Sequence, residues 1–270
     1  IIEKDFVTRL LEKFVMNVTA LNNFLECPLK FYYNNLIRIP SAKNEYTEFG
    51  SAVHHALWRL FVKLETAGGF PSKEEFIEDF KWYMYRHRES FIQQVFERRM
   101  EYGETILGEY YEARIKGMHK KAKVEETIEA VIFDDILLKG KLDKIEFYDK
   151  NIITVDYKTG SYDNALKKLK QPNEKLPLGG DYWRQAVFYK ILLDNSVKYK
   201  TYNAQSIVFD FIEPADKSNE YKKAEVVVSN DDIEIVKQQI KLSWEKIQNH
   251  EFYTGCGNPD CNYCNFVKLN

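Results

Sequence analysis

Gly-Lys-Leu-Asp-Lys-Ile-Glu at residues 140–146, followed by Thr-Val-Asp-Tyr-Lys-Thr-Gly at residues 154–160, is the stretch that decides the fold. Both pieces lie in runs rich in β-branched and aromatic residues, so each predicts a strand. Side chains two positions apart on a strand share one face, so Asp156 and Lys158 project the same way. Asp143 on the neighbouring strand can reach the same place. Two carboxylates and one amine are therefore expected to converge.

Such a group of side chains suits the hydrolysis of phosphodiester bonds. Carboxylate oxygens hold Mg²⁺ or Mn²⁺, and the cation lowers the pKa of a bound water and offsets charge on the scissile phosphate. A nearby lysine can orient or deprotonate that water and stabilise the transition state. These residues are therefore candidates for a catalytic metal site.

The triplet Asp156-Tyr-Lys158 is a weak signal by itself, because 30% of the residues are charged. A second triplet, Glu220-Tyr-Lys222, lies in a polar connection with no acidic strand before it. Asp156 instead follows a hydrophobic strand and has Asp143 upstream, which favours the first triplet. Surface charges at strand ends remain an equal alternative for the bare residues.

Helical periodicity fills the N-terminal part. Apolar residues recur at three- and four-residue spacings over residues 2–119, with Thr19 as a predicted N-cap and a predicted capping box from Ser72 to Glu75. After a long loop at residues 160–180, with one short helix near Leu166, the pattern returns. Two further helices are expected, at residues 182–193 and 231–247.

Strand patterns fill the middle of the chain, with turns expected at residues 134–135 and 149–151. The predicted strands are residues 124–133, 136–148, 152–157, 206–212 and 224–228. This order of elements predicts one α/β domain over residues 1–270 with a mixed sheet flanked by helices. Its expected parts are a mainly helical part at 1–120, a sheet core at 121–230, and a closing helix with a cysteine segment at 231–270.

The composition indicates a folded chain. Of 270 residues, 44% are hydrophobic and 15% aromatic, which is enough for one sizeable core or two small ones. No stretch approaches the roughly 18 consecutive apolar residues of a membrane span, and the N-terminus lacks a signal-peptide layout, so we expect a cytoplasmic protein. The chain does not begin with Met and starts within a helical pattern. We therefore expect a domain excised from a longer protein.

Charge neither suggests nor excludes a nucleic-acid partner. The net charge is −2 and the pI is about 6.3, which gives no sign of a basic surface. Two local clusters of basic residues stand out, and solvated faces of helices and loops are the simpler explanation for them. The clusters are Arg114, Lys116, His119, Lys120, Lys121 and Lys123, and Lys167, Lys168, Lys170 and Lys175.

The four cysteines are unevenly placed. Cys27 stands alone near the start, and Cys256, Cys261 and Cys264 lie close to the end. A Cys-x2-Cys pair in a chain expected to be cytosolic indicates a metal or cluster before disulfides.

Five segments resemble, in order, the motifs of RecB- and AddB-like nuclease domains of the PD-(D/E)XK superfamily. Val-Thr-Ala-Leu-Asn-Asn-Phe-Leu-Glu-Cys-Pro-Leu-Lys-Phe-Tyr resembles their N-terminal segment, and Phe-Gly-Ser-Ala-Val-His resembles their Gly-x3-His motif. The two strand motifs above resemble their metal-binding motifs, and Gln-Ala-Val-Phe-Tyr resembles the Gln-x3-Tyr motif that follows. The segments are residues 18–32, 49–54, 140–146, 156–160 and 185–189. The resemblance implies a restriction-endonuclease-like α/β core.

The resemblance also implies roles for individual residues. Lys158 would be the catalytic lysine, and Gln185 and Tyr189, one helical turn apart, would position the strand being cut. The implied ligands of Mg²⁺ or Mn²⁺ are His54, Asp143, Asp156 and the backbone carbonyl of Tyr157. Without the resemblance His54 would be an ordinary helix histidine, and His55 keeps that interpretation.

The cysteines fit the resemblance less closely. Some relatives close an iron–sulfur cluster with one cysteine before the nuclease motifs and three after, the latter spaced Cys-x2-Cys-x5-Cys. Here Cys261 and Cys264 supply the pair, but position 270 is Asn and Cys256 lies five residues before Cys261. Four thiolates fit [4Fe–4S] or tetrahedral zinc equally well by number, and free buried thiols are a third reading. We favour the cluster.

The implied function is hydrolysis of DNA, as an exonuclease on single-stranded ends in recombination and repair. The expected partners are DNA and an attached helicase domain or subunit, because RecB- and AddB-like nuclease domains usually occur with one. A stand-alone nuclease that trims DNA for CRISPR adaptation is the second reading. A non-catalytic DNA-binding scaffold module is the third, and intact Asp143, Asp156 and Lys158 argue against it.

Overall fold

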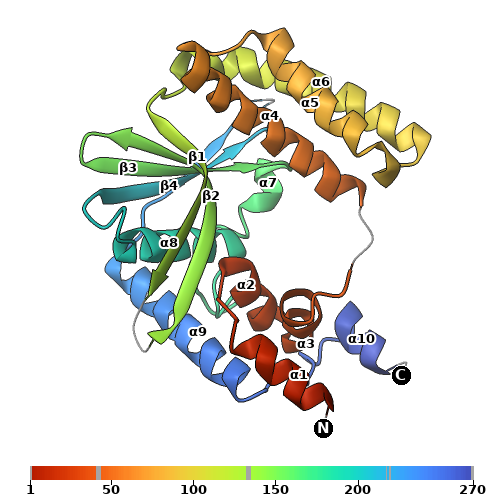
Figure 1. Ribbon diagram of the computed structural model, residues 1–270, viewed down its shortest axis with the longest axis vertical. Helices are drawn as coiled ribbons and strands as arrows, with labels where there is room; N and C mark the ends of the chain where they lie inside the picture. The colour runs from red at the N-terminus through yellow and green to blue at the C-terminus, as the bar shows by residue number, and fades with distance from the viewer. Residues whose placement is uncertain (1, 41–43, 132–134, 217, 219, 269–270) are drawn as a thin grey trace.

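We describe a computed structural model of the chain over residues 2–40, 44–131, 135–216, 218 and 220–268. At its centre lies a five-stranded mixed sheet with the spatial order β1-β2-β3-β4-β5 (Figure 1). The strands are β1 Ala122–Val131, β2 Leu137–Tyr148, β3 Asn151–Lys158, β4 Asn203–Phe211 and β5 Lys223–Val226. The first three form an antiparallel meander, β4 runs parallel to β3, and β5 runs antiparallel to β4.

All five predicted strands are confirmed, with ends that differ from the prediction by at most three residues where they are described. The predicted end of the first strand at 132–133 and the turn residue Asp134 lie outside the described residues. Asp149, in the predicted turn between β2 and β3, has a positive φ of 54°. Aspartate tolerates this left-handed conformation better than most residues, which suits a tight turn.

A crossover helix explains why the sheet is mixed. Parallel strands cannot be joined by a hairpin and need a long connection, commonly a helix. Here α8, Asp181–Asn195, lies between β3 and β4 in the sequence and packs against β4. The loop before it holds only the short helix α7, Tyr162–Ala165, which ends just before the predicted centre at Leu166.

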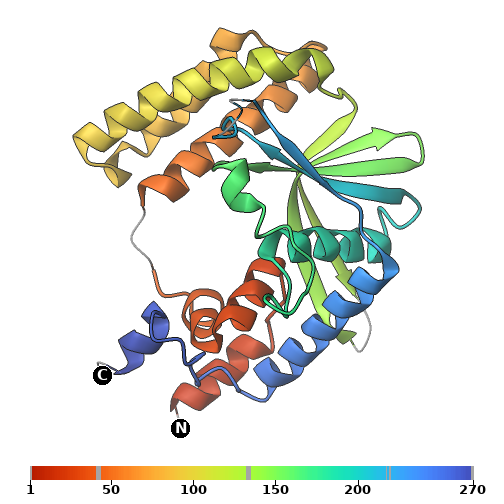
Figure 2. The ribbon, with the colours of Figure 1, turned by 180° about the vertical axis from the view of Figure 1, so that it is seen from behind.

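Helices cover both faces of the sheet, as the opposite views of Figures 1 and 2 show. One layer consists of α4, Glu45–Ala67, α5, Lys73–Arg86, and α6, Gln93–Arg114. It shares a hydrophobic core with Val155 and Tyr157 of β3. On the other face, α8 and α9, Asn230–Gln248, share a second core with the N-terminal helices.

The N-terminal helices and the C-terminal helix lie side by side in both views, far from the β2–β3 turn. These elements are α1 Ile2–Leu11, α2 Val18–Glu26, α3 Pro28–Phe31 and α10 Asn262–Lys268. A π-helical turn and two 3-10 turns complete the described elements: Tyr32–Leu36, Arg88–Ser90 and Ile115–Gly117. The sequence patterns did not predict α10. No helix in the described part of the chain is long and apolar enough to span a membrane.

One predicted helix cap is confirmed and the other is wrong. Ser72 and Glu75 form the predicted capping box at the start of α5. At α2, however, the N-cap is Asn17, whose side chain accepts a hydrogen bond of 2.8 Å from the Ala20 amide, and Thr19 lies inside the helix. Asn17 has the extended backbone that an N-cap needs, with φ −126° and ψ 169°. The helix therefore begins at Val18, one residue before Thr19.

The contact between α5 and α6 depends on Gly103. An added Cβ atom at Gly103 would lie 2.1 Å from Cζ of Phe80, which is fully buried. At Gly108 on the same helix, the nearest atom would be Ile77 Cδ1 at 3.5 Å, an ordinary contact. The two glycines therefore differ in packing although they share one helix.

We expect Gly103→Ala to destabilise the protein by about 1–3 kcal/mol, because the methyl group overpacks the α5–α6 contact. Gly108→Ala should instead stabilise it by up to about 1 kcal/mol, through the higher helix propensity of alanine. Chemical denaturation of the two variants beside the unchanged protein measures both effects. Equal stability of the two variants would contradict the close approach of α5 and α6.

Candidate active site and cysteine cluster

Strand β3 brings Asp156 and Lys158 together. Its alternation sends Val155 and Tyr157 to the α4–α6 layer, so Asp156 and Lys158 project from the opposite face, toward α8. Lys158 Nζ lies 2.6 Å from Asp156 Oδ2, and the side chain of Asp156 is only 5% exposed. The predicted convergence of this acid and this amine is confirmed.

Burial and the neighbouring charge act in opposite directions on this pair. Burial raises the pKa of the Asp156 carboxyl, and the positive charge of Lys158 offsets part of that effect. For Lys158, burial works to lower the pKa, but the charge and hydrogen bond of Asp156 outweigh it, so the pKa is raised. Lys158 is therefore a protonated hydrogen-bond donor at neutral pH in this arrangement.

Gln185 and Tyr189, one turn apart on α8, contact the pair directly. Gln185 Nε2 donates to Asp156 Oδ1 at 2.7 Å, and Gln185 Oε1 accepts from Lys158 Nζ at 3.0 Å. Gln185 Nε2 also donates to the Tyr189 hydroxyl at 2.8 Å, and that hydroxyl donates to the Lys141 carbonyl at 3.2 Å. Both residues face the site, as predicted. Their predicted interaction with a substrate strand stays a prediction.

Asp143 lies where β2, β3 and α4 meet. Its Oδ2 atom accepts a hydrogen bond of 2.9 Å from the Tyr157 amide and lies 3.4 Å from His54 Nδ1. The hydrogen bond from Tyr157 to Asp143 is made by the amide and does not involve the carbonyl. The predicted role of the Tyr157 carbonyl as a metal ligand stays a prediction. Asp143 joins the two metal-binding motifs in space.

Gly50, one turn before His54 on α4, lies close to Thr159 at the end of β3. A Cβ atom at Gly50 would lie 3.3 Å from Thr159 Oγ1, tighter than most contacts. The pKa of His54 is raised: burial opposes the charged form, but the contact with Asp143 and its charge outweigh burial. The Gly-x3-His motif thus places both its glycine and its histidine on the side of α4 that meets the sheet.

Glu125 on β1 is the residue that sequence reasoning missed. Val124 pairs with Lys144 and Glu126 pairs with Leu142, so Glu125 lies opposite Asp143. One ligand atom each from His54, Glu125 and Asp143 lie within 4.8 Å of one another. Glu125 and Glu126 are adjacent acids on one strand, so the sequence alone could not show which of the two lies near Asp143.

The backbone at Glu125 is strained. Its φ is 53°, in the left-handed region that costs a residue with a side chain about 1–2 kcal/mol. Such strain persists only where the surrounding structure enforces it, and it is frequent at functional sites. It adds an independent reason to include Glu125 in the site.

The donor set fits a divalent cation. An imidazole nitrogen and two carboxylates in one cluster match the ligands of Mn²⁺, and carboxylate oxygens with water match those of Mg²⁺. The predicted ligand Asp156 is not one of these three residues, and its carboxylate is held by Lys158 and Gln185. The cluster opens into a cavity of about 670 Å³, large enough for part of a substrate. Among the described residues that line this cavity, the predicted site residues Asp156, Lys158, Gln185 and Tyr189 are all missing.

The family model of the PD-(D/E)XK nuclease superfamily matches residues 15–269, nearly the whole chain. The chain belongs to the PD-(D/E)XK nuclease superfamily. This agrees with the mixed sheet flanked by helices and with the position of the acids on β2 and β3. The predicted restriction-endonuclease-like fold is confirmed.

Comparison of this PD-(D/E)XK protein with solved structures finds a structure of similar fold. A crystal structure from Eubacterium rectale, provisionally named an exonuclease, is 13% identical, has a TM-score of 0.61, and matches 93% of this chain and 87% of its own. That likeness shows the fold. The crystal structure of the protein SSO0001 is 14% identical over 100% of this chain and 96% of its own, with a TM-score of 0.40, too low to carry an argument. No curated protein sequence matches the chain.

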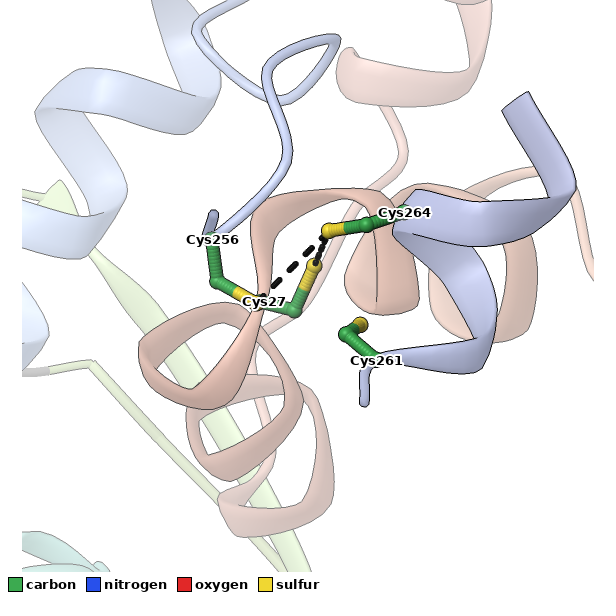
Figure 3. A group of neighbouring side chains, drawn as sticks. All are labelled: Cys27, Cys256, Cys261 and Cys264. Atoms are coloured by element: carbon green, nitrogen blue, oxygen red, sulfur yellow. Dashed lines mark hydrogen bonds between the residues drawn. The ribbon is translucent and has the colours of Figure 1, made fainter. Parts of the chain in front are cut away.

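The PD-(D/E)XK domain also brings its four cysteines together from the two ends of the chain (Figure 3). Cys27 precedes α3, Cys264 lies in α10, and Cys256 and Cys261 come from the loop between α9 and α10. Cys264 Sγ lies 3.8 Å from Cys27 Sγ and 3.7 Å from Cys256 Sγ, and all four sulfurs lie within 4.8 Å of one another. The four are free thiols, so the geometry fits a metal site with four sulfur ligands.

We expect Glu125→Gly and Glu125→Ala to separate the strain at this position from its carboxylate. Both remove the carboxylate, so both should weaken Mn²⁺ binding by a similar factor in calorimetric titration. Only glycine relieves the positive φ, so Glu125→Gly should be more stable than Glu125→Ala by about 1 kcal/mol. Unchanged Mn²⁺ affinity in both variants would remove Glu125 from the metal site.

Proposed function

We propose that this chain is a DNA nuclease that hydrolyses phosphodiester bonds with a bound Mg²⁺ or Mn²⁺. The observation that carries the proposal is the cluster of His54, Glu125 and Asp143 in an open cavity. The hydrogen bond from the Tyr157 amide to Asp143 joins this cluster to the strand that carries the Asp156–Lys158 pair. Superfamily membership supports the same reaction class. The cation would be held by this cluster together with Asp156, and when bound it would polarise the phosphate and acidify a water.

The protein's own residues hold the reacting groups in place. The Tyr157 amide fixes the Asp143 carboxylate, and Gln185 bridges Asp156 and Lys158. Lys158, as an ammonium, can orient the attacking water and donate to the oxygen on which negative charge develops. Because Gln185 and Tyr189 contact the acid and the amine, we assign them a positioning role, with the substrate interaction implied by the resemblance as the alternative.

The finer proposal is an exonuclease on single-stranded DNA ends, working with a helicase in recombination and repair. The five motifs in RecB- and AddB-like order support it, as does the fold shared with the Eubacterium rectale protein named an exonuclease. We also propose that residues 1–270 form one nuclease domain, because a single sheet carries the site and the cysteines join the two ends. A stand-alone nuclease and a non-catalytic DNA-binding module are the alternatives.

We further propose a structural metal centre at the four cysteines. The resemblance favours [4Fe–4S]. The sulfur separations of 3.7 and 3.8 Å instead match one tetrahedral ion, because a Zn–S bond of about 2.3 Å gives an S–S edge of about 3.8 Å. A four-iron cluster would need the thiolates farther apart. Close packing at Gly255, where a Cβ atom would lie 2.5 Å from Cys264 Sγ, limits how the loop can move.

We expect Lys158→Ala to lower the rate of cleavage of a labelled single strand in Mg²⁺ or Mn²⁺ by roughly 10²-fold or more, because the variant cannot stabilise charge in the transition state through this side chain. The fold and the binding of Mn²⁺ should persist, since Lys158 is not a ligand. Lys222→Ala, in the second triplet, is the matched control and should cleave normally. If Lys158→Ala keeps full activity, or if EDTA leaves the unchanged protein active, the proposed site is wrong.

We expect Cys27→Ser to lower the melting temperature and loosen the N-terminal helices while leaving Mn²⁺ binding at the nuclease site intact. The centre closes a loop of 229 positions from Cys27 to Cys256. By analogy with a disulfide, such a loop contributes about 5 kcal/mol, comparable to the whole stability of many domains. Metal analysis of protein prepared without oxygen identifies the centre. Iron with acid-labile sulfide assigns the cluster, zinc assigns a single ion, and no metal refutes the centre.

A further inference from the structure

A group of aromatic rings lies beside the candidate active site, on α4 and α5. The ring of His55, the residue after His54, lies 5.2 Å from the ring of Trp82, with the planes at 21°. The Tyr83 ring lies 5.2 Å from His55, and the Trp58 ring lies 5.5 Å from it. We call His55, Trp58, Trp82 and Tyr83 the ring platform.

Three members of the ring platform line the cavity of the His54, Glu125 and Asp143 cluster, and Trp82 lies outside that lining. The three members are His55, Trp58 and Tyr83. A phosphate held at the cluster would therefore have its neighbouring nucleotides beside these rings.

Packing of α4 against α5 accounts for only part of the ring platform, because Tyr83 packs against the core of these helices but Trp82 is not part of it. The contact between these helices and α6 is made by buried residues such as Phe49, Phe76 and Phe80. Trp82, in contrast, is 54% exposed, which is unusual for a residue that contributes mainly to a core. The other two tryptophans of the chain are used for packing: Trp183 is 1% exposed, and Trp244 stacks on Phe14.

Trp58 also lines a second cavity, of about 560 Å³, which continues along β1. Three lysines of one sequence cluster line it: Lys120, Lys121 and Lys123. Within the described residues, neither Lys120 nor Lys121 has an ion-pair partner. Two acids, Glu65 and Glu126, line the same cavity, and Glu126 is paired with Lys198. The excess of positive charge is complementary to a phosphate backbone.

We propose that the ring platform stacks the bases of a single nucleic-acid strand, whose backbone continues past Trp58 to Lys120, Lys121 and Lys123. The proposal rests on the proposed nuclease function and specifies its substrate. Base faces are free to stack on aromatic side chains only when the strand is unpaired, because a duplex hides them. Aromatic rings combined with a positively charged groove are the means by which proteins hold single strands without reading their sequence. Trp58 joins the cleavage site to the lysines.

Binding to an oligonucleotide with and without bases tests the ring platform. The probes are a labelled oligothymidylate, an abasic oligomer of the same length, and the oligothymidylate annealed to its complement. Anisotropy is measured in EDTA, so that no cleavage takes place. Stacking of one base contributes a factor of roughly 5 to 150 in affinity, so the unchanged protein should bind the oligothymidylate more tightly than the abasic oligomer and the duplex by about that factor.

Substitutions locate the effect. Trp58→Ala and Trp82→Ala should lower affinity for the oligothymidylate toward that for the abasic oligomer, whose binding should not change. Trp58→Phe keeps a ring and should restore most of the difference, which also controls for folding. The matched control is Phe6→Ala on α1, an exposed ring that lines neither cavity. Equal affinity of the unchanged protein for the two oligomers, or an equal decrease for both in Trp58→Ala, would overturn the platform.

The lysines have a separate readout. Replacing Lys120 and Lys121 with alanine should weaken binding of the oligothymidylate and the abasic oligomer equally. The slope of the logarithm of the binding constant against the logarithm of the salt concentration should become shallower by roughly 0.7 for each phosphate that is no longer neutralised. Replacing the exposed Lys241 and Lys246 on α9, on the other face of the sheet, is the control and should change neither. An unchanged salt dependence would remove the lysines from the path.

The outcome also separates this proposal from the nuclease proposal. If a divalent cation supports cleavage but the bases make no difference to binding, the nuclease stands and the ring platform is wrong. If the oligothymidylate binds more tightly than the abasic oligomer but no cation supports cleavage, the ring platform stands as a binding surface and the catalytic proposal fails.

Discussion

The hydrogen bond from the Tyr157 amide to the Asp143 carboxylate is the contact on which the candidate site depends. It holds the acid of β2 against β3, where Lys144 pairs with Val155. Because strand side chains alternate, a slip of one residue between these strands would turn Asp143 away from Asp156. The buried cores on both faces of the sheet prevent that slip, so packing far from the acids fixes their convergence.

Buried charge at this site is tolerated because each group has a partner. Asp156 would be costly to bury alone, but it contacts Lys158 and Gln185. Gln185 serves both members of the pair through its two amide atoms, so it sets their separation. The His54, Glu125 and Asp143 cluster gathers two acids in one place, where a cation would offset their repulsion.

The ends of the chain contribute at a distance from the acids. Cys27 and the three C-terminal cysteines join α3 to α10, on the side of the molecule where the two termini lie together (Figure 1). Because α2 also packs against α8 and α9, a metal centre there would stabilise the helices behind the sheet. The α4–α6 layer is attached on the opposite face and carries His54 with the ring platform.

The sequence by itself determined the strands, the motif residues and the convergence of Asp156 with Lys158, because strand periodicity and the spacing of i and i+2 are local properties. It also separated that pair from Glu220 and Lys222. The N-cap at Asn17, the helix α10 and the choice of Glu125 over Glu126 were decided by tertiary structure. Local patterns contain no information on which face of β1 meets Asp143, or on which exposed rings of α4 and α5 lie together. Those positions follow from how the layers pack.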